Sequence, residues 1–429
     1  MRVLVVGASG LIGSAVTARL SADGHSVTAV GRRRPEHGLL DVSFVRMDLS
    51  RATEPDDWLG HLTGIEAVVN CAGVLQDAPG QSTAGVHEKG VSALFRACER
   101  AGVRRVVHLS AVGVDRATPT GFSRTKLAGD QALMALDLDW VVLRPSVVVG
   151  RAAYGGSALL RGLAALPVLP VMPHTALLQI VHLDDLVRTI MFFLHPAAPS
   201  RCALDVVGPQ RQTFEQAVAL LRRWMRWPSA RTLGVPAWLA GLLYRAGDAV
   251  ALLGWRPPVT STARREMTRG ATGDGAPLTR LTGIEPRALE TALAAEPASV
   301  QERWFARLYL LKPAVFVMFS GFWIATGIVS LGPGWERGIE LVTSGGASEA
   351  FARFAVLAGG SADIVIGIAI AFRRTARLGL YAAFMISIAY AIIGTVLVPW
   401  MWLDPLGPML KIGPIMVFNL VALAILDDR

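Results

Sequence analysis

The sequence is poor in cysteine and in charged residues. Only 3 cysteines occur in 429 residues, Cys71, Cys98 and Cys202, and charged residues make up 17% of the chain. The cysteines are unevenly spaced and lack the close pairing of metal ligands, so neither a disulfide scaffold nor a resident metal is expected. We expect reduced thiols in a cytosolic domain.

Other features are also missing. The soluble part shows no internal repeat, and the first 20 residues lack the charged n-region of a signal peptide. The net charge of +9 is dispersed rather than gathered in a basic tract with interleaved aromatics. We therefore expect no nucleic-acid partner, and we expect basic surface to face a membrane instead.

Apolar residues are abundant near the C-terminus. The mean hydropathy of +0.44 is high for a soluble enzyme, and its cause is local. A buried helical bundle is the alternative, but amphipathic bundle helices keep a polar face, and these segments do not. We predict an all-α transmembrane domain over residues 305–429, with four helices that each approach the ~20 residues needed to cross hydrocarbon. The four segments are 308–331, 351–372, 378–398 and 409–426.

The charges around these segments predict their orientation. Basic residues precede the first segment and fill the second loop, whereas the other two loops are mainly acidic. The positive-inside rule then places the N-terminal domain and the C-terminus in the cytoplasm of a multi-pass inner-membrane protein. Asp363 interrupts the second segment, and a carboxylate in hydrocarbon is either a functional group or an interhelical hydrogen-bonding group.

Residues 1–300 have the pattern of an α/β domain. Valine-rich apolar runs alternate with helical patterns, as in a parallel sheet covered on both faces. We predict a Rossmann-type doubly wound sheet with a small substrate lobe, formed mainly by residues 151–180 and 208–300. A helix over 237–253 is expected to pack within this lobe, and a place on a membrane surface is the alternative. The predicted strands are 3–6, 26–30, 43–47, 67–70, 106–109, 140–143, 180–183 and 203–207.

A glycine-rich turn follows the first strand and predicts a dinucleotide site. Gly7 allows a sharp turn, Gly10 allows close approach to a pyrophosphate, and Gly13 allows the next helix to pack on the sheet. The phosphates are expected at the helix N-terminus, where N–H groups and the helix dipole favour anions. The predicted cofactor contacts in this turn are Gly7, Ser9, Gly10, Leu11, Ile12 and Gly13.

The second strand ends in arginines where NAD-binding proteins carry an acid. Arg32 and Arg33 can fork onto a 2′-phosphate, which favours NADP(H) over NAD(H). The alternative is a solvated basic turn. Asp48 and Leu49, after the third strand, are placed to contact adenine. The residues after the fourth strand, Cys71, Ala72 and Gly73, would bring backbone beside the ribose and nicotinamide.

These motifs resemble the extended and atypical short-chain dehydrogenase/reductase superfamily. The likeness covers about residues 1–300 and is near the epimerase-like branch that includes the 39-kDa-type accessory subunit of respiratory complex I. It rests on the glycine turn, on 48–49, 70–73 and 109–111, and on Arg144-Pro145-Ser146 and Val181 to Asp185. The resemblance implies that Pro145 borders the cofactor. It also implies that Ser110 orients the substrate oxygen and that Lys126 holds the ribose.

The resemblance fails at the proton-transferring tyrosine. That position, four residues before Lys126, is Phe122, whose ring cannot exchange a proton. Either another group substitutes, with Tyr154, Ser123 and His182 as candidates, or the site binds cofactor without ordinary turnover.

The apolar part resembles the DoxX-like family of four-helix membrane proteins, most clearly over residues 320–327. Some members of that family are implicated in passing electrons to quinone. The combined hypothesis is a membrane-tethered NADP(H)-binding oxidoreductase acting on a quinone, isoprenoid or lipid carbonyl. One alternative is a non-catalytic NADPH-binding module with a partner in a membrane complex, and a weaker one is a sugar-nucleotide epimerase or dehydratase. The sequence does not identify the substrate.

Overall fold

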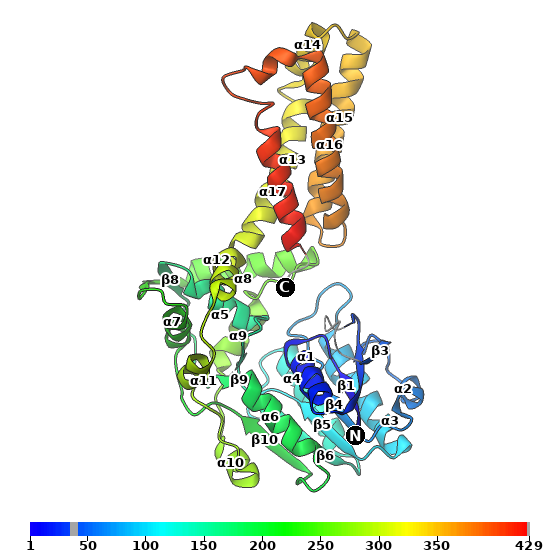
Figure 1. The fold of residues 1–429 in the computed structure, drawn as a ribbon, viewed down its shortest axis with the longest axis vertical. Coiled ribbons are helices and arrows are strands. Elements are labelled where there is room, and N and C mark those ends of the chain that lie inside the picture. The colour runs from blue at the N-terminus through cyan, green and yellow to red at the C-terminus, as the bar shows by residue number, and fades with distance from the viewer. Residues whose placement is uncertain (35–41, 427–429) are drawn as a thin grey trace. The chain divides into compact units, whose positions relative to one another are not determined.

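The structure is a computed structural model that describes residues 1–34 and 42–426. The chain forms two compact units, each described here by itself (Figure 1). The first comprises Met1–Asp248 and Pro257–Ala306, and the second comprises Ala249–Arg256 and the residues from Arg307 onward. The extreme C-terminus, which we predicted to be cytoplasmic, lies outside the described residues.

A seven-stranded parallel sheet forms the centre of the first unit, which confirms the predicted doubly wound fold. Its strand order is β10-β6-β5-β4-β1-β2-β3, so the direction of winding reverses between β1 and β4. The strands are β1 (Arg2–Val6), β2 (Ser26–Gly31), β3 (Ser43–Arg46), β4 (Ala67–Asn70), β5 (Arg105–Leu109), β6 (Asp139–Pro145) and β10 (Cys202–Val206).

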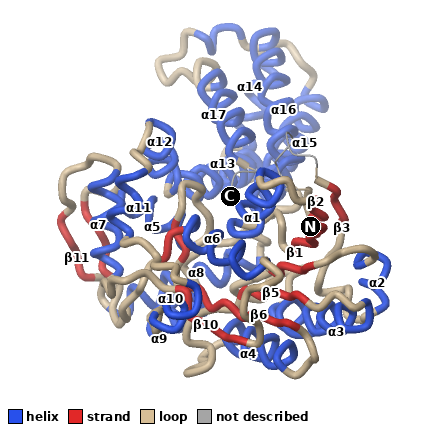
Figure 2. The backbone as a smooth tube through the Cα atoms, turned by 60° about the horizontal axis from the view of Figure 1, so that its bottom comes forward, coloured by secondary structure: helices blue, strands red, loops and turns tan. Residues whose placement is uncertain are grey.

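Helices cover both faces of this sheet (Figure 2). In β1, Val3 and Val5 join the apolar cluster on one face, while Leu4 and Val6 join the cluster on the other. This alternation buries every β1 side chain after Arg2 and explains the continuous apolar run in the sequence. The covering helices are α1 (Leu11–Ala22) and α6 (Leu183–Leu194) on the first face, and α2 (Asp56–Leu62), η1 (Gly85–Gly90), α3 (Val91–Ala101) and α4 (Gly121–Met134) on the second.

The rest of the first unit is a small lobe with its own apolar core. Residues 270–300 contain two short helices, the first with Pro277 in its first turn and Gly283 after its last residue. The lobe elements are β7 (Val148–Val149), α5 (Gly156–Ala164), β8 (Val168–Val171), β9 (Val181–His182), α7 (Phe214–Trp224), β11 (Arg231–Gly234), α8 (Ala237–Leu252), α9 (Ser261–Arg269), α10 (Ala276–Thr282), α11 (Leu289–Ala295) and α12 (Val300–Tyr309).

The prediction that α8 packs within the lobe is correct for only one stripe of the helix. Ala240 and Tyr244 are buried, but Trp238 is 68% exposed and Leu242 is 53% exposed. The apolar side chains opposite the buried stripe are therefore largely exposed.

The second unit is helical, and three of its helices are long and apolar enough to cross a membrane. They are α13 (Leu311–Leu331), α15 (Glu349–Ala371) and α16 (Ala376–Leu397). The fourth predicted segment forms α17 (Ile412–Ile425), which has 14 residues. A helix of that length rises about 21 Å, less than a ~30 Å hydrocarbon core, so a fourth span stays a prediction.

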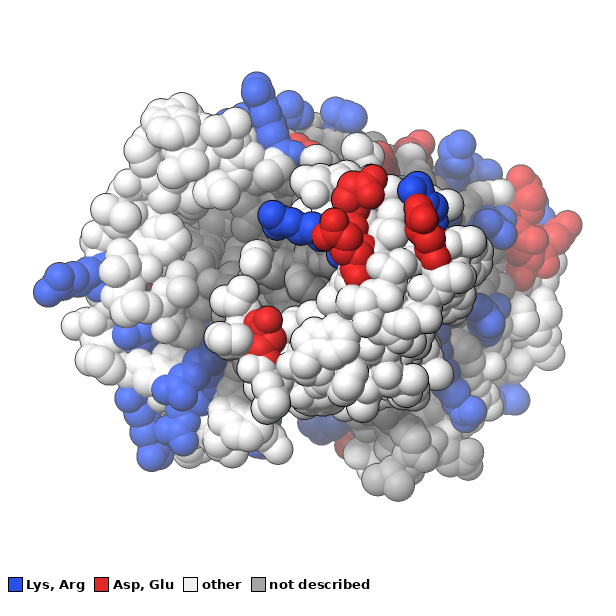
Figure 3. Space-filling model, turned by 90° about the horizontal axis from the view of Figure 1, so that it is seen from above, with Lys and Arg blue, Asp and Glu red and all other residues white. Residues whose placement is uncertain are grey.

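The first loop of this unit holds an amphipathic helix that we did not predict, α14 (Trp335–Ser344). Only Ile339 of α14 is buried, so the apolar signal in the sequence was too short to identify it. Charged side chains of both signs gather at the end of the unit seen in Figure 3, among a largely uncharged surface.

Candidate functional site

The glycine turn lies at the carboxyl end of β1, where the strand order reverses and where open α/β sheets bind ligands. Gly7 has φ +77°, and a Cβ there would lie 2.8 Å from the backbone nitrogen of Ala72. A Cβ on Gly13 would overlap the carbonyl of Gly7. Gly10 begins α1 without a side-chain cap, so the first-turn N–H groups remain available for phosphate oxygens.

The arginines follow directly on the neighbouring strand. Arg32 and Arg33 are exposed after β2. Gly31 adjoins the glycine turn, since a Cβ on Gly31 would lie 3.6 Å from the Ser9 hydroxyl.

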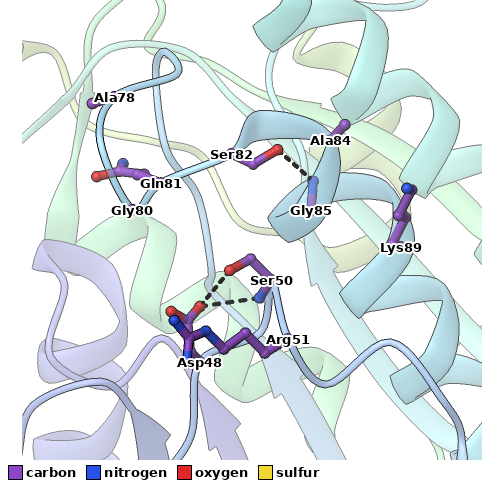
Figure 4. A pocket seen from close by; sticks show the side chains of 10 residues that line it. All are labelled: Asp48, Ser50, Arg51, Ala78, Gly80, Gln81, Ser82, Ala84, Gly85 and Lys89. Carbon is purple, nitrogen blue, oxygen red and sulfur yellow. Dashed lines mark hydrogen bonds between the residues drawn. The ribbon is translucent and has the colours of Figure 1, made fainter. Parts of the chain in front are cut away.

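Asp48 and Leu49 follow β3 beside a pocket of about 440 Å³. The backbone N–H and the hydroxyl of Ser50 donate to Asp48 Oδ1, at 3.1 and 2.8 Å, which fixes the carboxylate (Figure 4). The pocket itself was not predicted, although Asp48, one of its lining residues, was. It is lined by Asp48, Ser50, Arg51, Ala78, Gly80, Gln81, Ser82, Ala84, Gly85 and Lys89.

Lys126 on α4 joins the loops that follow β4 and β5. Its ammonium donates to the carbonyls of Ala72 at 3.1 Å and Leu109 at 2.7 Å. Two of its three N–H bonds are thus used, and a Cβ on Gly73 would lie 3.6 Å from Nζ. Burial lowers the pKa of Lys126 to about 8, and the charge of Asp130 opposes that shift.

Ser110 follows β5 beside this lysine contact. Its side chain is buried, and its hydroxyl has no hydrogen-bond partner of ordinary geometry among the residues that the structure describes. An unpaired buried hydroxyl is costly unless a ligand completes it. The structure thus brings Lys126, Ala72 and Gly73 together, with Ser110 directly after the Leu109 carbonyl that Lys126 contacts.

The remaining predicted residues also lie at the carboxyl edge. Pro145 ends β6, and its carbonyl accepts from the Val112 N–H at 3.0 Å. Cys71 follows β4, and burial raises the pKa of its thiol to about 12, so the thiol is not a nucleophile at neutral pH. The glycine cradle, the uncapped helix and the buried hydroxyl of Ser110 together fit a nicotinamide dinucleotide.

Matches to known families agree with this geometry. Residues 3–201 match the NAD dependent epimerase/dehydratase family, and residues 320–420 match the DoxX-like family. The chain joins an epimerase-type domain to a DoxX-like domain.

Individual relatives cover parts of the chain. An uncharacterised protein of Mycobacterium tuberculosis is 29% identical over 52% of this chain and 24% of its own length. The ceramide reductase of Caulobacter vibrioides is 26% identical over 44% of this chain and 60% of its own length. The chain thus spans about a quarter of the first relative and three fifths of the second.

Among solved structures, MoeE5 in complex with UDP-glucuronic acid and NAD aligns with a TM-score of 0.52. It is 22% identical and covers 68% of this chain and 97% of its own. At that identity the alignment supports the fold alone.

In the epimerase-type domain, Phe122 packs against His87, a residue that we did not predict at the site. Phe122 lies in the first turn of α4, and the His87 ring meets it edge-on at 5.6 Å between centroids. The Val74 N–H donates to His87 Nε2 at 2.9 Å, and Thr125 Oγ1 lies 3.0 Å from Nδ1. Burial, aided by the charge of Lys126, holds the pKa of His87 well below its usual range. A neutral imidazole with both nitrogens engaged is a poor proton donor.

A chain of buried polar groups lies behind Ser110. Asn70 Nδ2 contacts His108 Nδ1 at 2.9 Å, and His108 Nε2 lies 3.5 Å from Asp130 Oδ1. Arg144 donates to Asp130 Oδ2 at 3.1 Å. Burial alone would raise the pKa of Asp130, but His108, Ser110 and Arg144 outweigh it and lower the pKa. Asp130 is therefore an ionised carboxylate that is 0% exposed.

Two of the three substitutes considered for the missing tyrosine have structural tasks. Ser123 is 0% exposed and forms the capping box of α4 with Thr120. His182 caps α6, and its Nδ1 lies 3.3 Å from the guanidinium of Arg287. Tyr154 remains, in the loop before α5 with a ring that is 37% exposed.

Arg287 also accounts for the one group of possible metal ligands found among the described residues, His182, Asp184 and Glu296. Its guanidinium lies 3.6 Å from Asp184 and 3.3 Å from His182 Nδ1, so the chain already supplies a cation there. The same arginine pairs with Asp185, which is 2% exposed, through its backbone N–H at 2.9 Å and its Nε at 3.1 Å.

In the DoxX-like domain, Asp363 is paired between helices. The Tyr390 hydroxyl of α16 donates to Asp363 Oδ1 of α15 at 2.9 Å, and Asp363 is 2% exposed. Gly359, one turn earlier, leaves room for this contact, since a Cβ there would lie 3.0 Å from the Tyr390 hydroxyl. The interhelical hydrogen bond that we considered is thus present.

Proposed function

We propose that the chain is a membrane-tethered, NADP(H)-dependent oxidoreductase acting on a lipophilic substrate such as a quinone, isoprenoid or lipid carbonyl. The observation that carries the proposal is the Ser110–Lys126 site beside a dinucleotide cradle, in a chain with three helices long enough to span a bilayer. A tether raises the effective concentration of a site toward molecules dissolved in the membrane. The similarity to a ceramide reductase supports a lipid substrate.

The roles of the residues follow from their positions. When bound, the dinucleotide supplies a hydride. Lys126 would hold the ribose with its remaining N–H bond, and Ser110 would donate its hydroxyl to the substrate oxygen. Phe122 cannot deliver the proton that completes an alcohol, so reduction of ordinary carbonyls is slow.

A second candidate is a non-catalytic NADPH-binding module of a membrane complex. It is favoured by Phe122 and by the neutral His87 beside it, because neither group can act as the usual acid. A sugar-nucleotide epimerase or dehydratase is the weakest reading, because that chemistry depends on the missing tyrosine.

Membrane vesicles that contain the protein separate these functions. We expect NADPH oxidation that depends on an added quinone or long-chain aldehyde and is at least about tenfold slower in Lys126→Met, which loses a charge-assisted contact. If NADPH binds but no lipophilic acceptor oxidises it, the non-catalytic NADPH-binding module would be favoured. Equal rates of NADPH oxidation in the natural protein and in Lys126→Met would contradict the Ser110–Lys126 site.

The cofactor preference is a separate prediction. Arg32 and Arg33 replace the ribose-binding acid, so we expect NADPH to bind at least about tenfold more tightly than NADH, because two charge-assisted contacts at roughly 1.5–3 kcal/mol each exceed the required 1.4 kcal/mol. Titration of the Arg32→Ser, Arg33→Ser double variant should show the preference lost and NADH binding retained. Equal affinity for NADPH and NADH in the natural protein would refute the predicted preference for NADP(H).

The topology is also proposed: four spans in the inner membrane, with the epimerase-type domain in the cytoplasm. Arg373, Arg374 and Arg377 lie at the turn between α15 and α16, on the side that the positive-inside rule makes cytoplasmic. Reporter fusions after Gly345 should show the outer side, and fusions after Arg374 should show the cytoplasm. Exchanged signals would overturn the orientation.

A further inference from the structure

Helix α8 has an exposed apolar face. The helix has 16 residues, and its buried stripe consists of Ala240, Tyr244, Gly247 and Ala251. Contiguous exposed apolar surface is unusual in water and marks an interaction site. The large exposed side chains recur at helical spacing: Trp238, Leu239, Leu242, Leu243, Val250 and Leu252.

The chain just after α8 is fastened to the membrane helices. Residues Ala249–Arg256, which include the last four residues of α8, belong to the second unit. The Trp255 indole donates to the carbonyl of Ala371, the last residue of α15, at 2.7 Å, and its ring lies 4.8 Å from that of Phe316 in α13. The Arg373 N–H donates to the Leu253 carbonyl at 3.0 Å. Tryptophan and arginine at the end of spanning helices mark the level of the lipid headgroups.

The charges beside this face are basic. Arg245 is exposed on α8, and the exposed Arg264 lies over the Tyr244 ring at 5.9 Å. Asp248 accepts from the Ser261 N–H at 3.0 Å, which ties this carboxylate to the start of α9. Apolar side chains flanked by arginine are typical of helices that lie in a bilayer interface and contact anionic lipid.

We propose that α8 is an interfacial helix, whose apolar face enters the headgroup and upper acyl region of the leaflet at the α15–α16 turn. The occupant of the face is lipid, because α8 ends at Leu252 and runs directly into a segment held at headgroup level by Leu253 and Trp255. The proposal rests on the second unit spanning a membrane and is independent of the reaction proposed above.

Spin labels in the full chain test this proposal. Labels are placed on Leu242→Cys, on Val317→Cys as the lipid reference and on Leu281→Cys as the water reference, since these side chains are 53%, 67% and 39% exposed. Cys71, Cys98 and Cys202 are replaced by alanine in all three variants, and nanodiscs contain a neutral and an anionic lipid. Collisions with oxygen report lipid, and collisions with a water-soluble nickel chelate report solvent.

We expect the oxygen-to-nickel collision ratio at Leu242 to match that at Val317 and to exceed that at Leu281 by about tenfold. A nickel-accessible label like that at Leu281 would show that α8 lies in water and would overturn the proposal. Protection from both reagents, with spin–spin broadening that disappears on dilution with unlabelled chain, would show a second copy on this face and would also overturn it.

Radical footprinting of the unsubstituted protein in the same nanodiscs gives a second reading. Trp238 is 68% exposed and carries an indole, which radicals oxidise readily, whereas Leu281 is 39% exposed. We expect Trp238 to be oxidised less than Leu281, because lipid shields it. Oxidation in the reverse order contradicts the interfacial placement, and NADPH titration of the same samples reports separately on the cofactor site.

Discussion

Replacing Phe122 by tyrosine should increase NADPH-dependent carbonyl reduction by about 10²–10⁴, the usual contribution of a positioned acid or base. The change adds one oxygen to a half-buried ring that already packs on His87 at 5.6 Å between centroids. Lys126 on the next turn of α4 would lower the pKa of the new hydroxyl, and Ser110 would orient the substrate oxygen. Steady-state reduction of an aliphatic aldehyde, followed by loss of NADPH absorbance, measures the effect.

Two controls isolate the hydroxyl. Phe122→Leu replaces the ring by an alkyl side chain without adding an acid and should leave the trace activity unchanged. Lys126→Met combined with Phe122→Tyr should remove most of the gain. The NADPH dissociation constant should be the same in the natural protein and in Phe122→Tyr. If the natural protein reduces the aldehyde briskly and Phe122→Tyr changes nothing, another residue carries the proton, and Tyr154→Phe becomes the next test.

The second large effect concerns stability. Asp130→Ala should lower the free energy of unfolding of the epimerase-type domain by about 1–3 kcal/mol, because Arg144 loses its buried carboxylate and keeps only Asp115, whose side chain is 41% exposed. Asp130 is 0% exposed, and its Oδ2 accepts from Arg144 Nε at 3.1 Å. At roughly 2–4 °C per kcal/mol for a domain of this size, thermal unfolding of the full chain should shift by about 2–12 °C.

The chain offers a matched control for this variant. Arg19 and Asp23 also form an ion pair, at 2.8 Å, but their side chains are 54% and 35% exposed. Asp23→Ala should therefore cost about 0.5 kcal/mol or less. The double variant Asp130→Leu, Arg144→Met should recover part of the loss, because it removes both charges together. Equal melting temperatures for Asp130→Ala and Asp23→Ala would contradict the role given to the buried carboxylate.

The sheet and the cofactor cradle were predictable from the sequence because their signals are local. A valine-rich strand is followed directly by Gly7, Gly10 and Gly13. The spacing of these glycines predicts where the backbone turns. The three longest apolar helices were predictable for the same reason, since each is a continuous run. Helices α10 and α14 were missed, because short capped helices with few buried side chains leave little periodicity.

The polar side of the site was not predictable, because its partners are distant in the chain. His87 contacts Thr125, 38 residues later, and His108 contacts Asn70, 38 residues earlier. No periodicity relates such pairs. One signal was available: Asp130 follows Lys126 by four residues on α4, which places both on the same helix face. The exposure of α8 was also hidden, since an apolar stripe predicts burial without saying whether protein or lipid covers it.

The Asp185–Arg287 pair constrains the order of events during synthesis. The central strand β1 is synthesised before the other strands of the sheet. Asp185 on α6 can pair with Arg287 only when residue 287 has left the ribosome, about 15–60 s later at typical elongation rates. The first spanning helix begins at Leu311, a short distance further along. The lobe can therefore close over this contact only shortly before the membrane segments emerge. Variants that slow this closure should reduce the amount of inserted protein even where they leave the finished molecule stable.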